Sequence, residues 1–467
     1  MLKRILCLAL AALFALSIAA CGGDSDEGGK GSDKKTNGKG NTSNKSDEKA
    51  SSGGVSIVVE EEEVLETELA KKDFGGQSFV FYYWYEYGDI IDRKINLFNK
   101  EHNAKVKAQI IAGSFEENIS KSIAAGTPYD LIANHGIFFP QSIFTDIYEE
   151  LGSYIDERDY FDASKPGNGG ISKTVNSEFS WKGKLYACGS AKSIYQDVVY
   201  YNKLMFQNTG LEDPYQLWKD GQWTWDKFVA MGKEVTDVAN NIGFLSAVDL
   251  SIWWTMCGLS PVNHTGDTYT ENLGSQEIIT ATQQYANIFF GDSPISVAKT
   301  GSTAFNSGKA FTMVSSTDAY AACAEAAKKS GQFNRNANNL GVVPMPTGLA
   351  KDGKYPGHAA QGYSAAKGAK EPSLPCAYAL FESRTSDTDL GTTMQMPADV
   401  RNYVEEEFAK NGFLGFSGLQ NSEGEKSRPY LDKLGEKIRN GEDPTSTIAN
   451  ARNGLTRMIS DSVALAK

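Results

Sequence analysis

Residues 179–204 read FSWKGKLYACGSAKSIYQDVVYYNKL, and the rest of the chain is organised around this stretch. Its aromatic and branched residues predict two strands, one over 181–187 and the other over 198–201. Gly183, between two lysines, supplies the backbone freedom of a turn inside the first strand region. The linking residues 188–193 are few and small. They could cross from one body to another beside a ligand, or they could form an ordinary connection within one domain, and the spacing fits both.

The composition describes a chain with room for two or three globular domains. It has 467 residues, of which 40% are apolar and 11% aromatic, which is enough for large cores. The formal net charge of −12 argues against a nucleic-acid partner and against docking on anionic lipid, because both need a basic face. After the first 20 residues, no apolar run is long enough to span a bilayer.

The cysteines beyond the amino-terminal region do not suggest a metal site. Cys188, Cys257, Cys323 and Cys376 are scattered, with no C-x-x-C pair, so a zinc site is not expected. One or two disulfides and four free thiols both fit this spacing. We expect no metal and no cofactor.

The amino terminus carries a processing signal. Lys3 and Arg4 precede an apolar run over residues 5–18, and small residues then lead to Cys21. The arrangement resembles a bacterial lipobox, which implies cleavage before Cys21 and diacylglycerol on its thiol. Two acyl chains, at about 0.8 kcal/mol per buried CH₂, anchor a protein stably. We therefore expect a signal peptide over 1–20, a disordered tether over 21–75, and a place on the outer face of the cytoplasmic membrane.

The first globular stretch alternates strands and helices. Strands are predicted over 79–84, 106–111 and 129–133, and helices over 90–98 and 115–125. This β-α-β-α-β order predicts an α/β fold with a parallel sheet and right-handed crossovers. Ligands of such sheets bind beyond the carboxyl ends of the strands. The candidate ligand residues at those ends are Tyr85, Glu86, Tyr87, Asn134 and His135.

Further candidates lie in later segments. Tyr195 and Asp197 follow the linking residues, Asp318 follows a strand over 311–315, and Tyr363 lies in a strand over 358–365. Asp249, Trp253 and Trp254 share a predicted helix, and two adjacent tryptophans are not expected to face the same core. Aromatic platforms with carboxylates and amides suit a sugar, which has apolar faces and a rim of hydroxyls. Packing in the core or on a strand is the alternative role for each aromatic residue.

Several motifs in order resemble one known family. They lie at 98–102, 128–132, 181–187, 200–204, 221–226, 305–310 and 341–346. With the lipobox, they are similar to family 1 extracellular solute-binding proteins of ABC importers, of the maltose or multiple-sugar type. The resemblance covers roughly residues 76 to 400, and each motif alone is loose.

The resemblance implies a two-lobed clamshell of the periplasmic-binding-protein type II, each lobe being a mostly parallel sheet flanked by helices. Transferred to this chain, lobe 1 is 76–190 with 300–357, and lobe 2 is 191–299 with 358–467. The crossing between lobes then falls at 188–193. The resemblance also implies a monomer without catalytic activity that binds a carbohydrate and delivers it to the ABC permease.

The chain departs from the maltodextrin binders at two places. Asn134 and His135 stand where those proteins commonly have an aromatic residue and an acid, and Tyr195 stands where they tend to have an acid. A mono- or short oligosaccharide is therefore expected rather than a long linear glucan. The alternatives are a peptide or other polar solute on the same fold, and a secreted glycosidase using Glu86 and Asp318 as its carboxylate pair.

Overall fold

The structure is a computed structural model that describes residues 67–464, except 84–88, 111–113, 137–138, 140, 163–168, 266, 298–300, 386–394, 416–418 and 420–426. All described residues belong to one compact unit, Val64–Lys467. The predicted signal peptide, Cys21 and almost all of the predicted tether lie outside the described residues. Among the helices of the described part, none combines the length and the apolar character needed to cross a bilayer.

The predicted β-α-β-α-β segment is confirmed. Its elements are β1 (Ser78–Tyr83), α2 (Asp89–Glu101), β2 (Lys105–Ile110), α3 (Phe115–Ala124) and β3 (Leu131–His135). Strand β1 lies between β2 and β3 and is parallel to both. Phe81 is fully buried, and the ring of Tyr82 stacks on Tyr129 at 4.7 Å. The continuous apolar run of this strand is therefore buried on both faces, as parallel strands covered by helices require.

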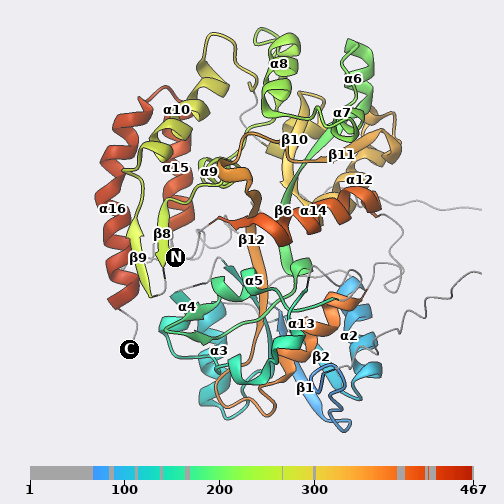
Figure 1. Ribbon diagram of the computed structural model, residues 1–467, viewed down its shortest axis with the longest axis vertical. Helices are drawn as coiled ribbons and strands as arrows, with labels where there is room; N and C mark the ends of the chain where they lie inside the picture. Colours follow the sequence, from blue (N-terminus) through green and yellow to red (C-terminus); the bar gives the residue numbers. More distant parts are fainter. Residues whose placement is uncertain are drawn as a thin grey trace, which may run out of the picture. The chain divides into compact units, whose positions relative to one another are not determined.

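Two long strands, β6 (Ile194–Asn202) and β12 (Tyr355–Ser364), connect the sheet across its middle. Residues 361–364 of β12 pair with β3, and Ala359 and Ala360 pair with Tyr195 and Ile194 of β6. From Asp197 onward, β6 pairs with β10 (Ala310–Ser316) and from Val198 with β11 (Leu340–Pro344), and β10 pairs with β7 (Gly243–Leu245). Figure 1 shows β6 in green and β12 in orange running between these two groups of strands.

We call β1, β2, β3 and residues 361–364 the first subsheet, and residues 197–202, β7, β10 and β11 the second subsheet. The pairing groups the chain differently from the expected lobes, in which 300–357 joined 76–190. Strands β10 and β11 instead occupy the two edges of β6, and the chain returns to the first subsheet only in β12. A hydrophobic pattern identifies a strand but does not say which partner it takes, and this explains the difference.

The opening stretch forms a small hairpin followed by β6. Strands β4 (Ser180–Trp181) and β5 (Lys184–Leu185) pair with each other, and Lys182 and Gly183 both have positive φ in the turn. Cys188 still bridges to Tyr363 of the first subsheet. The crossing to the second subsheet therefore lies in the first residues of β6 and not in 188–193, where we expected it.

The remaining elements are helices and three short strands. The first group is α4 (Gln141–Phe144), α5 (Lys173–Glu178), α6 (Lys203–Thr209), α7 (Pro214–Lys219), α8 (Trp225–Val235), α9 (Leu250–Met256), α10 (Gln276–Phe290) and α11 (Gly301–Asn306). The second group is α12 (Tyr320–Lys329), α13 (Leu374–Arg384), α14 (Ala398–Asn411), α15 (Ser427–Arg439) and α16 (Pro444–Ala464). The short strands are β8 (Val262–Thr265), β9 (Thr268–Glu271) and β13 (Gly412–Leu414).

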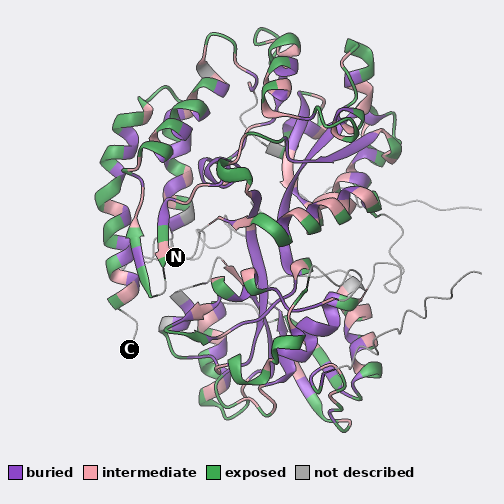
Figure 2. Cartoon of the chain, in the orientation of Figure 1, coloured by how far each residue is buried: buried purple, intermediate pink, exposed green. Residues whose placement is uncertain are grey.

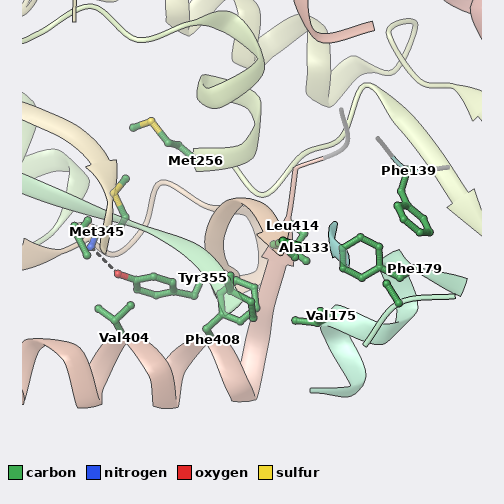
Figure 3. Close-up of a cluster of buried hydrophobic side chains, with 14 of the residues drawn as sticks. Ala133, Phe139, Val175, Phe179, Met256, Met345, Tyr355, Val404, Phe408 and Leu414 are labelled. Atoms are coloured by element: carbon green, nitrogen blue, oxygen red, sulfur yellow. Dashed lines mark hydrogen bonds between the residues drawn. The ribbon is translucent and has the colours of Figure 1, made fainter. Parts of the chain in front are cut away.

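The core follows the sheet. Figure 2 shows the central strands buried along their length, while helices such as α14 and α16 have one buried and one exposed face. In Figure 3, Tyr355 at the start of β12 lies beside Val404 and Phe408 of α14, and its hydroxyl accepts a hydrogen bond from the amide of Met345 at 3.2 Å. Close packing on both sides fixes the position of β12 and, with it, the side chains that β12 carries toward β6.

Candidate functional site

Polar side chains gather where β3, β6 and β12 meet. His135 is the last residue of β3, and Tyr195 and Asp197 lie two residues apart on β6, which places them on the same face of the strand. His358 and Gln361 come from β12, and Gln361 pairs with His135. These five residues, His135, Tyr195, Asp197, His358 and Gln361, are called the hinge cluster below. Three of them were predicted from the sequence as ligand residues.

Tyr195 is the centre of the hinge cluster. Its ring neighbours two imidazoles, 5.3 Å from that of His135 and 5.8 Å from that of His358, measured between ring centroids. The interplanar angles are 30° and 18°. Its hydroxyl donates a hydrogen bond to Gln361 Oε1 at 3.2 Å. Residues from all three strands are thus held against one partly exposed aromatic ring.

Asp197 and His358 form a close pair. Asp197 Oδ1 and His358 Nδ1 are 2.7 Å apart, and the Asp197 side chain is almost fully buried while that of His358 keeps 21% of its surface exposed. Asp197 Oδ2 is buried without a hydrogen-bond partner. An unsatisfied buried acceptor costs about 1–3 kcal/mol. The geometry therefore provides a carboxylate oxygen that a further hydrogen-bond donor would stabilise.

A bulge in β12 presents His358 to Asp197. Gly357 pairs with Gln196 and Ala359 with Tyr195, so β12 carries one more residue than β6 over this step. The additional residue in a bulge is left outside the regular ladder and its side chain is turned from the usual direction. His358 is that residue, which accounts for its contact with the buried carboxylate.

A second carboxylate lies near His358. Asp318 belongs to a short 3₁₀ helix, Thr317–Ala319, that follows β10 directly, and Ser316 at the end of β10 pairs with Asp197. Solvent reaches the Asp318 side chain, yet many protein atoms surround it. This desolvation raises the pKa of the Asp318 carboxyl, against opposing effects of Ser316 and His358. His358 thus contacts the carboxylate of Asp197 directly and interacts electrostatically with that of Asp318.

Asn134 lies next to His135 and holds the backbone of the hinge cluster in place. It is fully buried, its amide donates to Ser364 Oγ at 3.2 Å, and its side-chain oxygen accepts from the backbone amide of His135 at 3.0 Å. These bonds join β3 to β12 and fix the backbone that carries His135. Asn134 was also predicted to contact a ligand, and this contact stays a prediction.

Trp253 and Trp254 are core residues. Both are fully buried, and their indole nitrogens donate to the backbone oxygen of Ala281 at 2.6 Å and to Thr282 Oγ1 at 3.0 Å. We expected one of them to face a ligand because adjacent tryptophans point in different directions. The expectation is corrected because α9 packs against both α10 and α15, so each direction is covered.

Two other predicted residues are not members of the hinge cluster, although the Tyr363 hydroxyl accepts a hydrogen bond from Gln361 at 3.5 Å. Asp249 is exposed immediately before α9 and makes no capping hydrogen bond. Tyr363 is buried, and its hydroxyl donates to Glu382 Oε1 at 2.9 Å, so its predicted ligand contact is corrected to a packing role. Glu382 also accepts from Lys94 and Ser193, and this network lowers its pKa although burial alone would raise it.

The remaining predictions concern three ligand candidates, the cysteines and metal binding. Tyr85, Glu86 and Tyr87 lie outside the described residues. Cys188, Cys257, Cys323 and Cys376 are free thiols. Within the described ranges, no three or more His, Cys, Asp or Glu side chains are grouped so that they could hold a metal ion.

Sequence reasoning missed His358. A signal was present, because His358 and Gln361 are polar residues inside a run of small and apolar residues that reads as a buried strand. Polar residues are found in a buried strand only where hydrogen-bond partners are available to them.

One protein family matches the chain. The description of the family is "bacterial extracellular solute-binding protein", and the match spans residues 85–387. This range contains β6, β12 and the whole hinge cluster. A comparison with curated protein sequences gives no significant match.

Solved structures of similar fold include three with different ligands. An ABC substrate-binding protein of Listeria monocytogenes in complex with cycloalternan has a TM-score of 0.55 and 18% identity, covering 82% of this chain and 99% of its own. The galacto-N-biose/lacto-N-biose I-binding protein of a Bifidobacterium longum ABC transporter, in complex with lacto-N-biose, has a TM-score of 0.57 and 14% identity, with 84% and 99% covered. UgpB of Mycobacterium tuberculosis in complex with glycerophosphocholine has a TM-score of 0.56 and 16% identity, covering 82% of this chain and 98% of its own. The chain thus has the mixed α/β fold of the periplasmic binding proteins.

Proposed function

The chain belongs to the bacterial extracellular solute-binding proteins, and from this premise we propose that it captures a mono- or short oligosaccharide for the permease of an ABC importer. Family membership makes it a binding protein and not an enzyme, which argues against the glycosidase alternative.

The hinge cluster is the observation that carries the proposal. A sugar needs an apolar platform for its C–H faces, and hydrogen-bond acceptors and donors for its hydroxyls. Tyr195 offers a partly exposed ring, Gln361 binds its hydroxyl, and the imidazole of His135 lies 5.3 Å away. The unpartnered Oδ2 of Asp197 suits a hydroxyl donor. The departures from a long-glucan site at residues 134, 135 and 195 favour a small sugar.

The location of the cluster connects binding to movement. Tyr195 and Asp197 lie on β6 and His358 on β12, the two strands that join the first and second subsheets. A ligand held there contacts both connecting strands at once. We infer that binding shifts an open–closed equilibrium toward the closed arrangement, which then docks on the permease, as hinge closure around a ligand does generally.

The anchoring follows from the amino-terminal sequence. Cys21 is proposed to carry diacylglycerol and to hold the protein on the outer face of the cytoplasmic membrane, with residues 22–75 as the tether. Intact-mass spectrometry of the membrane-extracted protein tests this assignment. A mature chain that begins at residue 21 with the mass of a lipid is expected, and an unmodified Cys21 would contradict it.

Calorimetric titration of the protein tests the ligand class. The panel contains mono-, di- and trisaccharides, short peptides and glycerophosphodiesters such as glycerophosphocholine. Binding of at least one sugar, weakened by Tyr195→Ala and unchanged by Tyr154→Ala on the surface, is the expected result. Binding of a peptide or a glycerophosphodiester with no response to any sugar would overturn the carbohydrate assignment.

A further inference from the structure

A small hairpin projects from the segment between α9 and α10. Strands β8 and β9 pair with each other and with no other strand of the described chain. His264 and Tyr269 are opposite each other, and their rings stack at 4.3 Å with an interplanar angle of 3°. Tyr269 is buried, whereas Thr268 and Thr270 are exposed. The hairpin therefore has one packed face and one solvent face.

The base of the hairpin is attached to the helices beside the second subsheet. Arg452 of α16 donates to both carboxylate oxygens of Glu271, with Nε and Nη2 each 3.1 Å from Oε2. Asn272 donates to the backbone oxygen of Ser260 at 2.8 Å, which closes the base. Glu271 is largely buried, and two-point contacts of this kind hold geometry as well as charge. The hairpin thus has a firm base (Figure 1, β8 and β9 beside α16).

The outer end of the hairpin contacts the β4–β5 hairpin. Trp181 stacks on Tyr269 at 5.7 Å and 19°, so that Trp181, Tyr269 and His264 form a row of three rings. The amide of Lys182 donates to Asp267 Oδ1 at 2.6 Å. Lys182 and Gly183 both have positive φ, as in a tight primed hairpin turn. Asp267 thus accepts a hydrogen bond from a backbone amide in the β4–β5 turn that points away from the β4–β5 hairpin.

The β4–β5 hairpin is in turn attached to the first subsheet. The amide of Leu151 donates to the oxygen of Leu185 at 2.7 Å. Phe179 packs edge-on against Phe139 at 4.6 Å and covers Gly362, where an added Cβ would lie 2.7 Å from the Phe179 ring. The contact between the two hairpins therefore links elements of the first subsheet to elements of the second, separately from β6 and β12.

We propose that the β8–β9 hairpin is a latch that holds the two subsheets in the arrangement described here. If the subsheets swing apart about β6 and β12, the Trp181–Tyr269 stack and the Asp267–Lys182 hydrogen bond must break. The latch therefore adds to the stability of the arrangement described here whatever the ligand is. This inference does not depend on the carbohydrate assignment.

The latch can be tested by measuring the distance between the two subsheets in the ligand-free protein. Spin labels are placed at Ser120→Cys on α3 and Lys233→Cys on α8, both exposed, in a full chain whose Cys7, Cys21 and Cys323 are replaced by serine. Pulsed electron paramagnetic resonance then gives the distribution of label separations. The latch variants are Asp267→Ala, which removes only an exposed carboxylate, and Tyr269→Leu, and the control is Thr270→Ala on the solvent face.

Tyr269→Leu is expected to raise the ratio of long to short separations by about tenfold, since one aromatic contact corresponds to a shift of that order. Asp267→Ala is expected to raise it about three- to tenfold, since it removes one hydrogen bond of the latch, and the control should leave it unchanged. If the distributions of folded Asp267→Ala and Tyr269→Leu equal that of the parent, the latch is excluded. If Tyr269→Leu does not fold, Asp267→Ala alone decides. A variant that is less stable to denaturant but keeps the parent distribution also counts against the latch.

Discussion

Asp197 Oδ1 and His358 Nδ1 are 2.7 Å apart, although they lie on different strands, β6 and β12, and are separated by 161 residues in the chain. The pair joins the two strands that connect the subsheets, next to the ring of Tyr195. It therefore stands both in the structural hinge and in the proposed ligand site, and changes at either residue should affect stability and binding together.

Removal of the histidine should destabilise the fold. In His358→Ala, the buried Asp197 carboxylate loses its described side-chain partner, and we expect a loss of about 1–3 kcal/mol in the free energy of unfolding. Urea denaturation measures this. The exposed Asp249→Ala should change the value by less than about 0.5 kcal/mol. Equal effects of the two substitutions would show that the pair contributes nothing specific.

The ring of Tyr195 should matter more to binding than its hydroxyl. Tyr195→Ala removes the platform and should weaken affinity for the sugar identified by titration by about tenfold or more, because aromatic contacts contribute on the order of 1 kcal/mol beyond buried area. Tyr195→Phe keeps the ring and loses only the bond to Gln361, so its effect should be smaller. A larger loss in the Phe variant would assign the contact to the hydroxyl.

The buried tryptophans separate stability from binding. Trp254→Ala should cost about 3–5 kcal/mol of stability, because it leaves a cavity in the core and removes the hydrogen bond that Thr282 Oγ1 accepts from the indole. The variant protein that still folds should bind the same sugar with unchanged affinity. Calorimetry on the folded fraction checks this. An affinity loss with little effect on unfolding would restore Trp254 to the ligand site.

Glu178 should make stability depend on pH. Burial raises the pKa of its carboxyl to about 7. Glu178 in turn acts on Tyr269, since burial first, then the charges of Glu178 and Asp267, raise the pKa of the Tyr269 phenol. Since the folded state binds a proton more tightly than the unfolded state, stability falls as pH rises from about 4.5 to 7.

In Glu178→Gln, this part of the pH dependence should be missing. At pH 8 the variant should be the more stable protein by up to about 3 kcal/mol, an upper bound from the size of the shift, and below pH 4.5 the difference should be small. Denaturation curves at pH 4.5 and 8 give both values. Parallel curves for the two proteins would remove Glu178 as the cause.

The sequence predicted the order of elements in the first subsheet because apolar runs and helical spacing are local signals. His135, Tyr195 and Asp197 were selected as candidates because they lie at or near the ends of predicted strands, and their contact with a ligand stays a prediction. Strand partners were not predicted, because pairing joins residues more than a hundred positions apart. The placement of β10, β11 and the second half of β12 therefore differs from the expected grouping.

The tryptophan pair illustrates the same limit for side chains. From the sequence, Trp253 and Trp254 were not expected to pack into the same core. Helix α15, far along the chain, covers the side of α9 that was expected to be open. Tyr363 likewise looked like a strand-end aromatic, and its partner Glu382 comes from α13. His358 was overlooked because a bulge, which depends on the register of two strands, directs it toward Asp197.

That bulge also restricts how the protein can diverge. The extra residue of a bulge lies outside the regular ladder, so deletion of residue 358 would let Gly357 and Ala359 pair with consecutive residues of β6 and would leave the pairing of residues 359–364 unchanged. Asp197 would then lose its partner His358. A deletion within residues 359–364 would instead turn the rest of the strand over, because side chains alternate across a strand. Descendants of this sequence can therefore shorten β12 without a change of register only at residue 358, and such a change removes the partner of the buried carboxylate.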